Sequence, residues 1–133
     1  MTANNLPPTA VALAFVDHIN RGNLNGLVAM MSEGHRLEVF DEEPVIGREA
    51  NAAAWRRYMA AFPRYQIYLR RINATGAVVA ILGHTTGSHL GLPDAKEREL
   101  TMIWLAYVRD ATVERWQLIE DSPSNRQQVG LDG

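Results

Sequence analysis

The chain has 133 residues, 47% of them hydrophobic and 21% charged, with a formal net charge of −2 and no cysteine. This length fits one domain, and the lack of a basic excess argues against nucleic acid as a partner. Without cysteine, disulfides, thiolate zinc sites and cysteine nucleophiles are excluded. The N-terminus lacks a signal-peptide pattern and no apolar run could span a membrane, so we expect a soluble, cytoplasmic protein.

The first half of the chain predicts helices with one strand among them. After a flexible lead-in over residues 1–8, apolar residues recur at helical spacing twice, and Gly22 suits the turn between these helices. A third helix begins after Gly47 and is stopped by Pro63. The predicted order is helix, helix, strand and helix, at 9–20, 24–31, 36–41 and 48–62.

The second half of the chain is dominated by strand patterns. Long alternating segments are separated by turn signals, and Gly83 and Gly87 predict bends or bulges. Residues 109–111 predict a tight turn. We expect strands at 65–72, 77–89, 98–108 and 112–120, followed by a polar, mobile C-terminal tail over 122–133.

Helices that precede strands are typical of an α+β fold with an antiparallel sheet. Glycines inside the long strand make a curved sheet plausible. We therefore predict one domain over residues 9–121, in which a curved antiparallel sheet is wrapped by three N-terminal helices around an apolar pocket.

Several short sequence motifs occur in the order that is typical of a known protein family. They are Pro44–Ala50, Ala60–Pro63, Gly83–Gly87, Glu114–Trp116 and Gln127–Leu131. In these motifs the chain resembles the SnoaL-like polyketide cyclase and ketosteroid isomerase group of the nuclear transport factor 2-like superfamily. The resemblance implies a cone-shaped α+β barrel and a homodimer formed through the outer face of the sheet. The fold hosts cyclases, isomerases, hydratases, epoxide hydrolases and non-enzymatic binders, so it does not fix a reaction.

Two acids at the end of the last strand are the first candidates for chemistry. Alternation places Trp116 and Glu120 on one face, with Asp121 next in the chain. In the family pattern, a tryptophan is followed four residues later by an acid that acts as general acid/base, which implies this role for Glu120, or for Asp121 if the register shifts. The alternative is a solvated pair of acids.

Asp41 is a further acidic candidate. Ketosteroid isomerases carry a proton-shuttling aspartate in a similar place, directly before a Pro-Val word. Here two glutamates stand between Asp41 and Pro44, and the alternative is a charged turn.

His84 lies in the middle of the long predicted strand. Family members often carry a histidine one position later, so His84 faces the other side unless Gly83 is bulged. If it faces inward, it could polarise a carbonyl or relay a proton. The alternative is a hydrogen-bonded histidine of the core or of an interface.

The aromatic residues are the expected walls of the pocket. Trp55 and Tyr58 share one face of the third helix, since they are three residues apart. Trp104 and Trp116 lie on adjacent strands, nearly opposite each other across the 109–111 turn, and could form the floor for a polycyclic or aromatic ligand. Phe15, on the first helix, is a further candidate for ligand binding.

No cofactor or metal is expected. The chain has no phosphate-binding loop or dinucleotide-binding glycine word. Its histidines, at 18, 35, 84 and 89, do not have the spacing of metal ligands, and His84 and His89 fall on opposite faces of a regular strand.

Two functions stay open. The first is a cofactor-independent acid/base enzyme of cyclase, isomerase or hydratase type, acting on a hydrophobic substrate, with Tyr58 donating to the developing oxyanion. The second is a non-catalytic binding or assembly domain. If the side chains of Glu120, Asp121 and Asp41 all point to solvent, the second is favoured; one of them buried in a pocket without a cationic partner favours the first.

Overall fold

A computed structural model describes residues 6–132 of the chain. One six-stranded sheet, in the order β2-β1-β6-β5-β4-β3, forms the centre of the molecule. The strands are β1 (Met31–Val39), β2 (Val45–Ile46), β3 (Gln66–Thr75), β4 (Val78–Thr86), β5 (Met102–Arg109) and β6 (Thr112–Glu120). The helices are α1 (Pro8–Asn20), α2 (Leu24–Ala29), α3 (Arg48–Ala61), α4 (Asp94–Glu97) and α5 (Pro123–Gln128).

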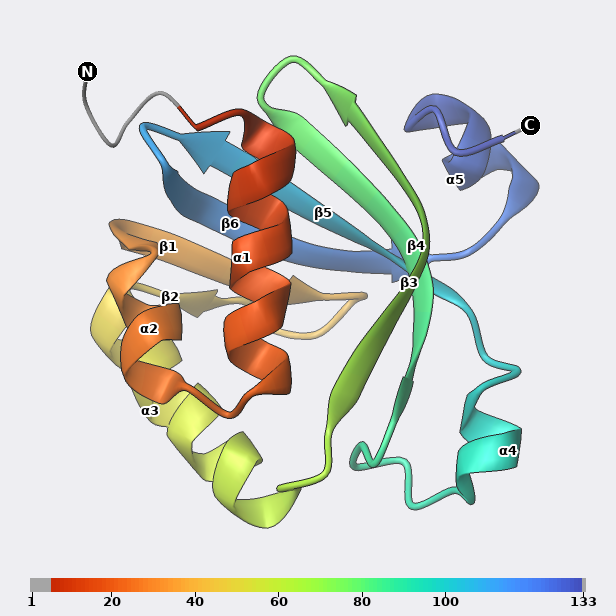
Figure 1. Ribbon diagram of the computed structural model, residues 1–133, viewed down its shortest axis with the longest axis horizontal. Helices are drawn as coiled ribbons and strands as arrows, with labels where there is room; N and C mark the ends of the chain where they lie inside the picture. Colours follow the sequence, from red (N-terminus) through yellow and green to blue (C-terminus); the bar gives the residue numbers. More distant parts are fainter. Residues whose placement is uncertain (1–5, 133) are drawn as a thin grey trace.

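The first three helices lie on one side of the sheet. Figure 1 shows α1 across the sheet and α3 beside the β1–β2 end, while α5 lies on the opposite side. This arrangement confirms the predicted α+β fold. The sheet is antiparallel except that β1 runs parallel to β6. These two strands are separated by most of the chain, so no hairpin dictates their direction.

The lead-in and the start of β1 differ from the predictions. Most of the 1–8 lead-in lies outside the described residues, and Pro8 is already the first residue of α1. Residues 31–35, expected in a helix and a loop, belong to β1, because α2 ends at Ala29 and the Val113 amide donates to the Met30 carbonyl at 2.7 Å.

Glycines shape the sheet where the strands bend. A bulge interrupts β3 between Leu69 and Arg71, opposite Gly83 of β4. A Cβ atom at Gly83 would lie 2.1 Å from the Tyr68 carbonyl oxygen, so only glycine permits this close approach. Gly87, with a φ of 69°, follows the last residue of β4.

Alternation along the strands separates two apolar clusters. The inner cluster joins the helices to residues such as Ile81, Trp104 and Trp116. The outer cluster lies on the other face and consists of Ala80, Leu82, Ile103, Leu105 and Leu131.

The C-terminal segment is not the mobile polar tail that we predicted. Ser122 caps α5 by accepting a hydrogen bond from the Asn125 amide at 3.1 Å. Leu131 is only 3% exposed in the outer cluster, and its carbonyl accepts a hydrogen bond from Arg71 at 3.0 Å. Burial of one apolar residue in a polar sequence therefore ties this segment to the sheet.

Candidate functional site

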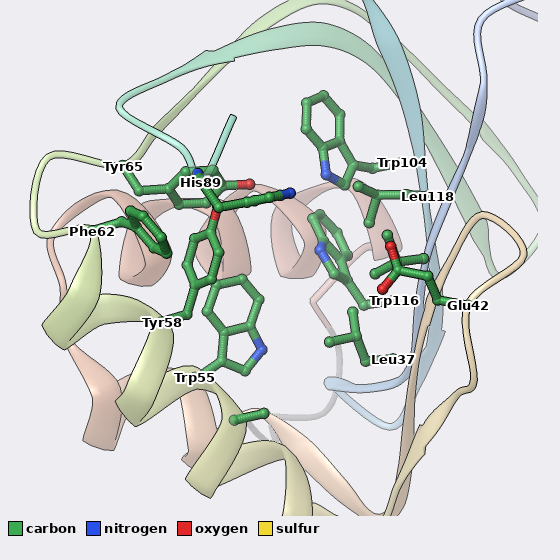
Figure 2. Close-up of a pocket in the computed structure, with 12 residues that line it drawn as sticks. Leu37, Glu42, Trp55, Tyr58, Phe62, Tyr65, His89, Trp104, Trp116 and Leu118 are labelled. Carbon is green, nitrogen blue, oxygen red and sulfur yellow. The ribbon is translucent and has the colours of Figure 1, made fainter. Parts of the chain in front are cut away.

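A cavity of about 410 Å³ opens between α3 and the inner face of the sheet. This volume is in the range of small-molecule sites. All three tryptophans of the chain contribute to it, and Figure 2 shows their rings around the same space. The lining residues are Leu37, Val39, Glu42, Ala54, Trp55, Tyr58, Phe62, Tyr65, His89, Trp104, Trp116 and Leu118.

The sheet supplies one wall through every second residue of three strands. Leu37 and Val39 come from β1, Trp116 and Leu118 from β6, and Trp104 from β5. The two tryptophans share the inner face but are not directly opposite. Trp104 pairs with Leu118, two residues from the position that we predicted. One residue of this offset arises because the turn is centred between Asp110 and Ala111, and the other from a register shift between Tyr107 and Val108.

The α3 side forms an aromatic wall. The Tyr58 ring lies 6.1 Å from Trp55, 5.0 Å from Tyr65 and 4.8 Å from Phe62, between ring centroids. These residues come from α3 and from the segment that leads into β3. Such packing makes a rigid apolar surface suited to a flat ligand.

The clearest polar feature of the cavity is a hydrogen-bonded pair, Tyr58 and His89. The Tyr58 hydroxyl lies 2.8 Å from His89 Nδ1, and the His89 backbone amide donates to the same oxygen at 3.2 Å. Burial, and to a smaller extent the nearby Glu97 charge, raises the pKa of Tyr58, so the phenol keeps its proton at neutral pH.

The contact between Tyr58 and His89 fits two tautomers of the neutral ring. In one, the Tyr58 oxygen accepts from both the His89 amide and Nδ1–H. In the other, the Tyr58 hydroxyl donates to Nδ1 and the ring proton resides on Nε2. Figure 2 shows the His89 ring extending into the cavity, so this N–H is available to a ligand acceptor.

Glu42 is the one carboxylate among the described residues that line the cavity. It follows Asp41, which is exposed and does not line it. Strand alternation would have placed Asp41 on the face of Leu37 and Val39, but Phe40 adopts a φ of 48° and ends it. Because the backbone turns at this point, Glu42 lines the cavity in place of Asp41, the acid that we expected there.

The acids at the end of β6 lie outside the cavity lining. Glu120 is exposed. Asp121 is paired with Arg126 through contacts of 2.6 and 2.8 Å and accepts a hydrogen bond from Thr101 at 2.5 Å. The hydrogen bonds from Arg126 hold the pKa of Asp121 below its usual range. The structure thus gives Asp121 a structural ion pair with α5.

His84 and Phe15 also lie outside the cavity lining. His84 pairs with Tyr68 of β3, and the two rings stack with centroids 4.7 Å apart. It shares the outer face with Ala80 and Leu82, since no bulge shifts β4. Phe15 is fully buried behind Trp116, with ring centroids 4.9 Å apart, and so supports the cavity without lining it.

Of the predicted site residues, the cavity lining thus includes Trp55, Tyr58, Trp104 and Trp116. It does not include the predicted acids or His84, whereas Glu42 and His89 do line the cavity. The sequence did hold a signal for His89, because it follows Gly87, a residue that predicts a bend at the end of β4. Within residues 6–132, no three potential metal ligands gather in one place.

Comparison with known proteins fits this architecture. A family model described as a SnoaL-like domain matches residues 12–116. The chain belongs to the SnoaL-like family. No curated protein matches its sequence significantly.

Solved structures similar to this SnoaL-like protein share its fold at low identity. A candidate polyketide cyclase from Sinorhizobium meliloti is 14% identical, with a TM-score of 0.70 over 90% of this chain and 100% of its own. A nuclear transport factor 2-like protein of unknown function from Cytophaga hutchinsonii is 10% identical, with a TM-score of 0.68 over 90% and 95%. TerC, crystallised with polyporic acid, is 13% identical, with a TM-score of 0.70 over 94% and 99%. The nuclear transport factor 2-like fold is thus confirmed.

Among the described residues, no helix combines the length and the apolar character needed to cross a bilayer.

Proposed function

We propose that this SnoaL-like protein binds a hydrophobic, planar small molecule in the cavity between α3 and the sheet. The observation that carries the proposal is the convergence of all three tryptophans on one 410 Å³ space. Glu120, Asp121 and Asp41 do not line that space. Asp41 and Glu120 are exposed and Asp121 is paired with Arg126, so none of these acids is an unpaired carboxylate inside the cavity.

The polar groups of the cavity give the ligand an orientation. Nε2 of His89 offers a hydrogen-bond donor on the α3 side, while Glu42 stands on the sheet side. The His89 donor suits a ligand with an acceptor oxygen.

A cavity-filling substitution tests the binding site directly. Ala54→Phe adds a ring inside the cavity, whereas Ala60→Phe adds the same ring to an exposed position of α3. The probes are 8-anilinonaphthalene-1-sulfonate, a hydrophobic dye, and polyporic acid, the compound in the TerC crystal. We expect both probes to raise the melting temperature of wild type and Ala60→Phe but not that of Ala54→Phe. Equal shifts in all three proteins would disprove the site.

A second function, proton transfer, is supported by the opposed Glu42 and His89. The Glu42 carboxylate would accept a proton from the carbon next to a substrate carbonyl, and His89 Nε2–H would donate to the enolate oxygen that forms. Returning the proton from Glu42 to another carbon would complete an isomerisation. In a cyclisation the enolate would attack a second carbonyl of the same molecule, and the proton on Glu42 would go to the alkoxide formed there.

Deuterium exchange tests this second function without knowledge of the natural product. Wild-type protein in heavy water should speed exchange next to the carbonyl of cyclic ketones, followed by NMR. Glu42→Gln should lower the rate by about 100-fold or more, while Glu43→Gln, at a neighbour that does not line the cavity, should not. If wild type shows no exchange above background, proton transfer is contradicted and only the binding function stands.

A homodimer through the outer sheet face and a cytoplasmic location stay predictions. The C-terminal segment covers part of that face, so we propose contact through the uncovered part, where Tyr68 is 42% exposed. Sedimentation that detects only monomer at micromolar concentration would contradict the dimer.

A further inference from the structure

Glu97 is a buried acid that the cavity lining does not include. Its side chain at the end of α4 is fully buried, and it belongs to none of the ion pairs found within residues 6–132. A carboxylate removed from water without a cation is costly unless hydrogen bonds replace the lost hydration. Its partners therefore indicate what it does.

The partners of Glu97 are Thr85 and Ser88, which precede His89 in the chain. One carboxylate oxygen accepts a short hydrogen bond from the Thr85 hydroxyl, and the other accepts from the Ser88 backbone amide at 3.4 Å. The Leu90 amide in turn donates to the Ser88 hydroxyl oxygen at 3.3 Å. Glu97 thus holds the backbone directly before His89, and Ser88 links this part to the residue that follows His89.

The Glu97 carboxylate is ionised in this network. Burial opposes its charge, but the hydrogen bonds from Ser88 and Thr85 outweigh burial and hold the pKa of Glu97 below its usual range. The charge also contributes to the raised pKa values of Tyr58 and Tyr65, which line the cavity. Glu97 is therefore close enough to act on the polar groups of the cavity without lining it.

We propose that Glu97 is a positioning residue, which holds the loop after β4 so that His89 keeps its hydrogen bond to Tyr58 and presents Nε2–H to the cavity. The consequence for ligands rests on the proposed function, but the placement of His89 exists in the free protein. A chain with this loop released would populate both ring tautomers of His89 and lose a fixed donor.

NMR of protein labelled with ¹⁵N-histidine tests the placement without a ligand. At about pH 8, where an ordinary imidazole is neutral, wild-type His89 should show two well-separated ring nitrogen signals, assigned by their loss in His89→Gln. In Glu97→Gln these two signals should move toward each other, as for an averaging imidazole. The exposed acid in the same segment gives the matched control, Glu99→Gln, which should match wild type.

Thr85→Val gives an independent route, because it removes one donor to Glu97 while keeping the side-chain shape. Thr85→Val should shift the His89 signals in the same direction as Glu97→Gln. It therefore still tests the proposal if Glu97→Gln does not fold. Unchanged His89 signals in a folded Glu97→Gln or Thr85→Val protein would overturn the proposal and show that Glu97 only stabilises the loop.

Dye binding separates this proposal from the proposed function. We expect 8-anilinonaphthalene-1-sulfonate to bind Glu97→Gln about tenfold more weakly than Glu99→Gln, the size of one lost hydrogen bond. Equal affinities of the two variants would count against the positioning role. If the dye does not bind wild type, the proposed function fails, while the NMR comparison still decides the role of Glu97.

Discussion

His35 is the fully buried titratable group of the inner core. Its Nδ1–H donates to the Val113 carbonyl at 2.6 Å, while Nε2 has no partner in the structure. Burial lowers the pKa of His35, and the bond to Val113 opposes this only in part. Burial also lowers the pKa of His84, together with the charges of Arg70 and Arg98. Both histidines therefore link folding to pH.

The sign of this linkage follows from the direction of the shifts. Since the folded-state pKa values lie below the unfolded value of about 6.5, the unfolded chain binds protons first as pH falls. The stabilisation is complete above about pH 6.5 and is lost as pH falls through the folded values. Urea unfolding at about pH 8 and pH 5.5 should show a lower free energy of unfolding at the lower pH.

A histidine variant identifies the source of this dependence. His84→Phe keeps a ring to stack on Tyr68 and should reduce the dependence, while the part that comes from His35 stays. Stability that is constant or rises as pH falls over this range would contradict the assignment. The lowered pKa values of Glu38, Glu97 and Asp121 act only at lower pH, below about 4.5.

Residue roles could be predicted from the sequence only where strand alternation was unbroken. Trp116 reached the cavity wall because β6 runs regularly from Arg115 to Glu120. Asp41 did not, because Phe40 turns the chain with a positive φ. Glu97 gave no signal in advance, since its importance comes from partners in a loop that only the fold brings together.

At the scale of elements, the bend of β3 over β4 depends on Gly83. Gly83→Ala would place a Cβ 2.1 Å from the Tyr68 carbonyl oxygen and 3.3 Å from the Trp104 ring. We expect a loss of about 2 kcal/mol or more in the free energy of unfolding, as for overpacked cores. Gly34→Ala, which meets nothing within 4 Å, is the control in urea unfolding. A variant as stable as wild type would mean that the strands can move apart freely.

The C-terminal segment is the second element whose contribution can be measured. Leu131→Ala should lower the free energy of unfolding by about 2–4 kcal/mol, because a buried side chain is lost from the outer cluster. Gln127→Ala, on the exposed side of α5, should change it by less than about 0.5 kcal/mol. Equal stability of both variants would show that the segment does not hold to the sheet.

The sequence predicted the main helices and strands but not the short helices α4 and α5. The long apolar repeats of α1, β4 and β5 were readable because burial imposes a regular period. By contrast α5 is short and polar, and its place depends on Leu131 reaching the distant outer cluster. The parallel pairing of β1 with β6 was hidden for the same reason, since pairing between distant segments leaves no local pattern.

For the whole molecule, the central claim is that the cavity between α3 and the sheet is a ligand site. The intrinsic tryptophan fluorescence of the chain reports on this site, because all of its tryptophans line the cavity. The most direct measurement is tryptophan fluorescence during titration with 8-anilinonaphthalene-1-sulfonate. We predict saturable quenching with one dye per chain, abolished in Ala54→Phe and kept in Ala60→Phe. Absent quenching in wild type, or quenching that survives Ala54→Phe, would contradict the account.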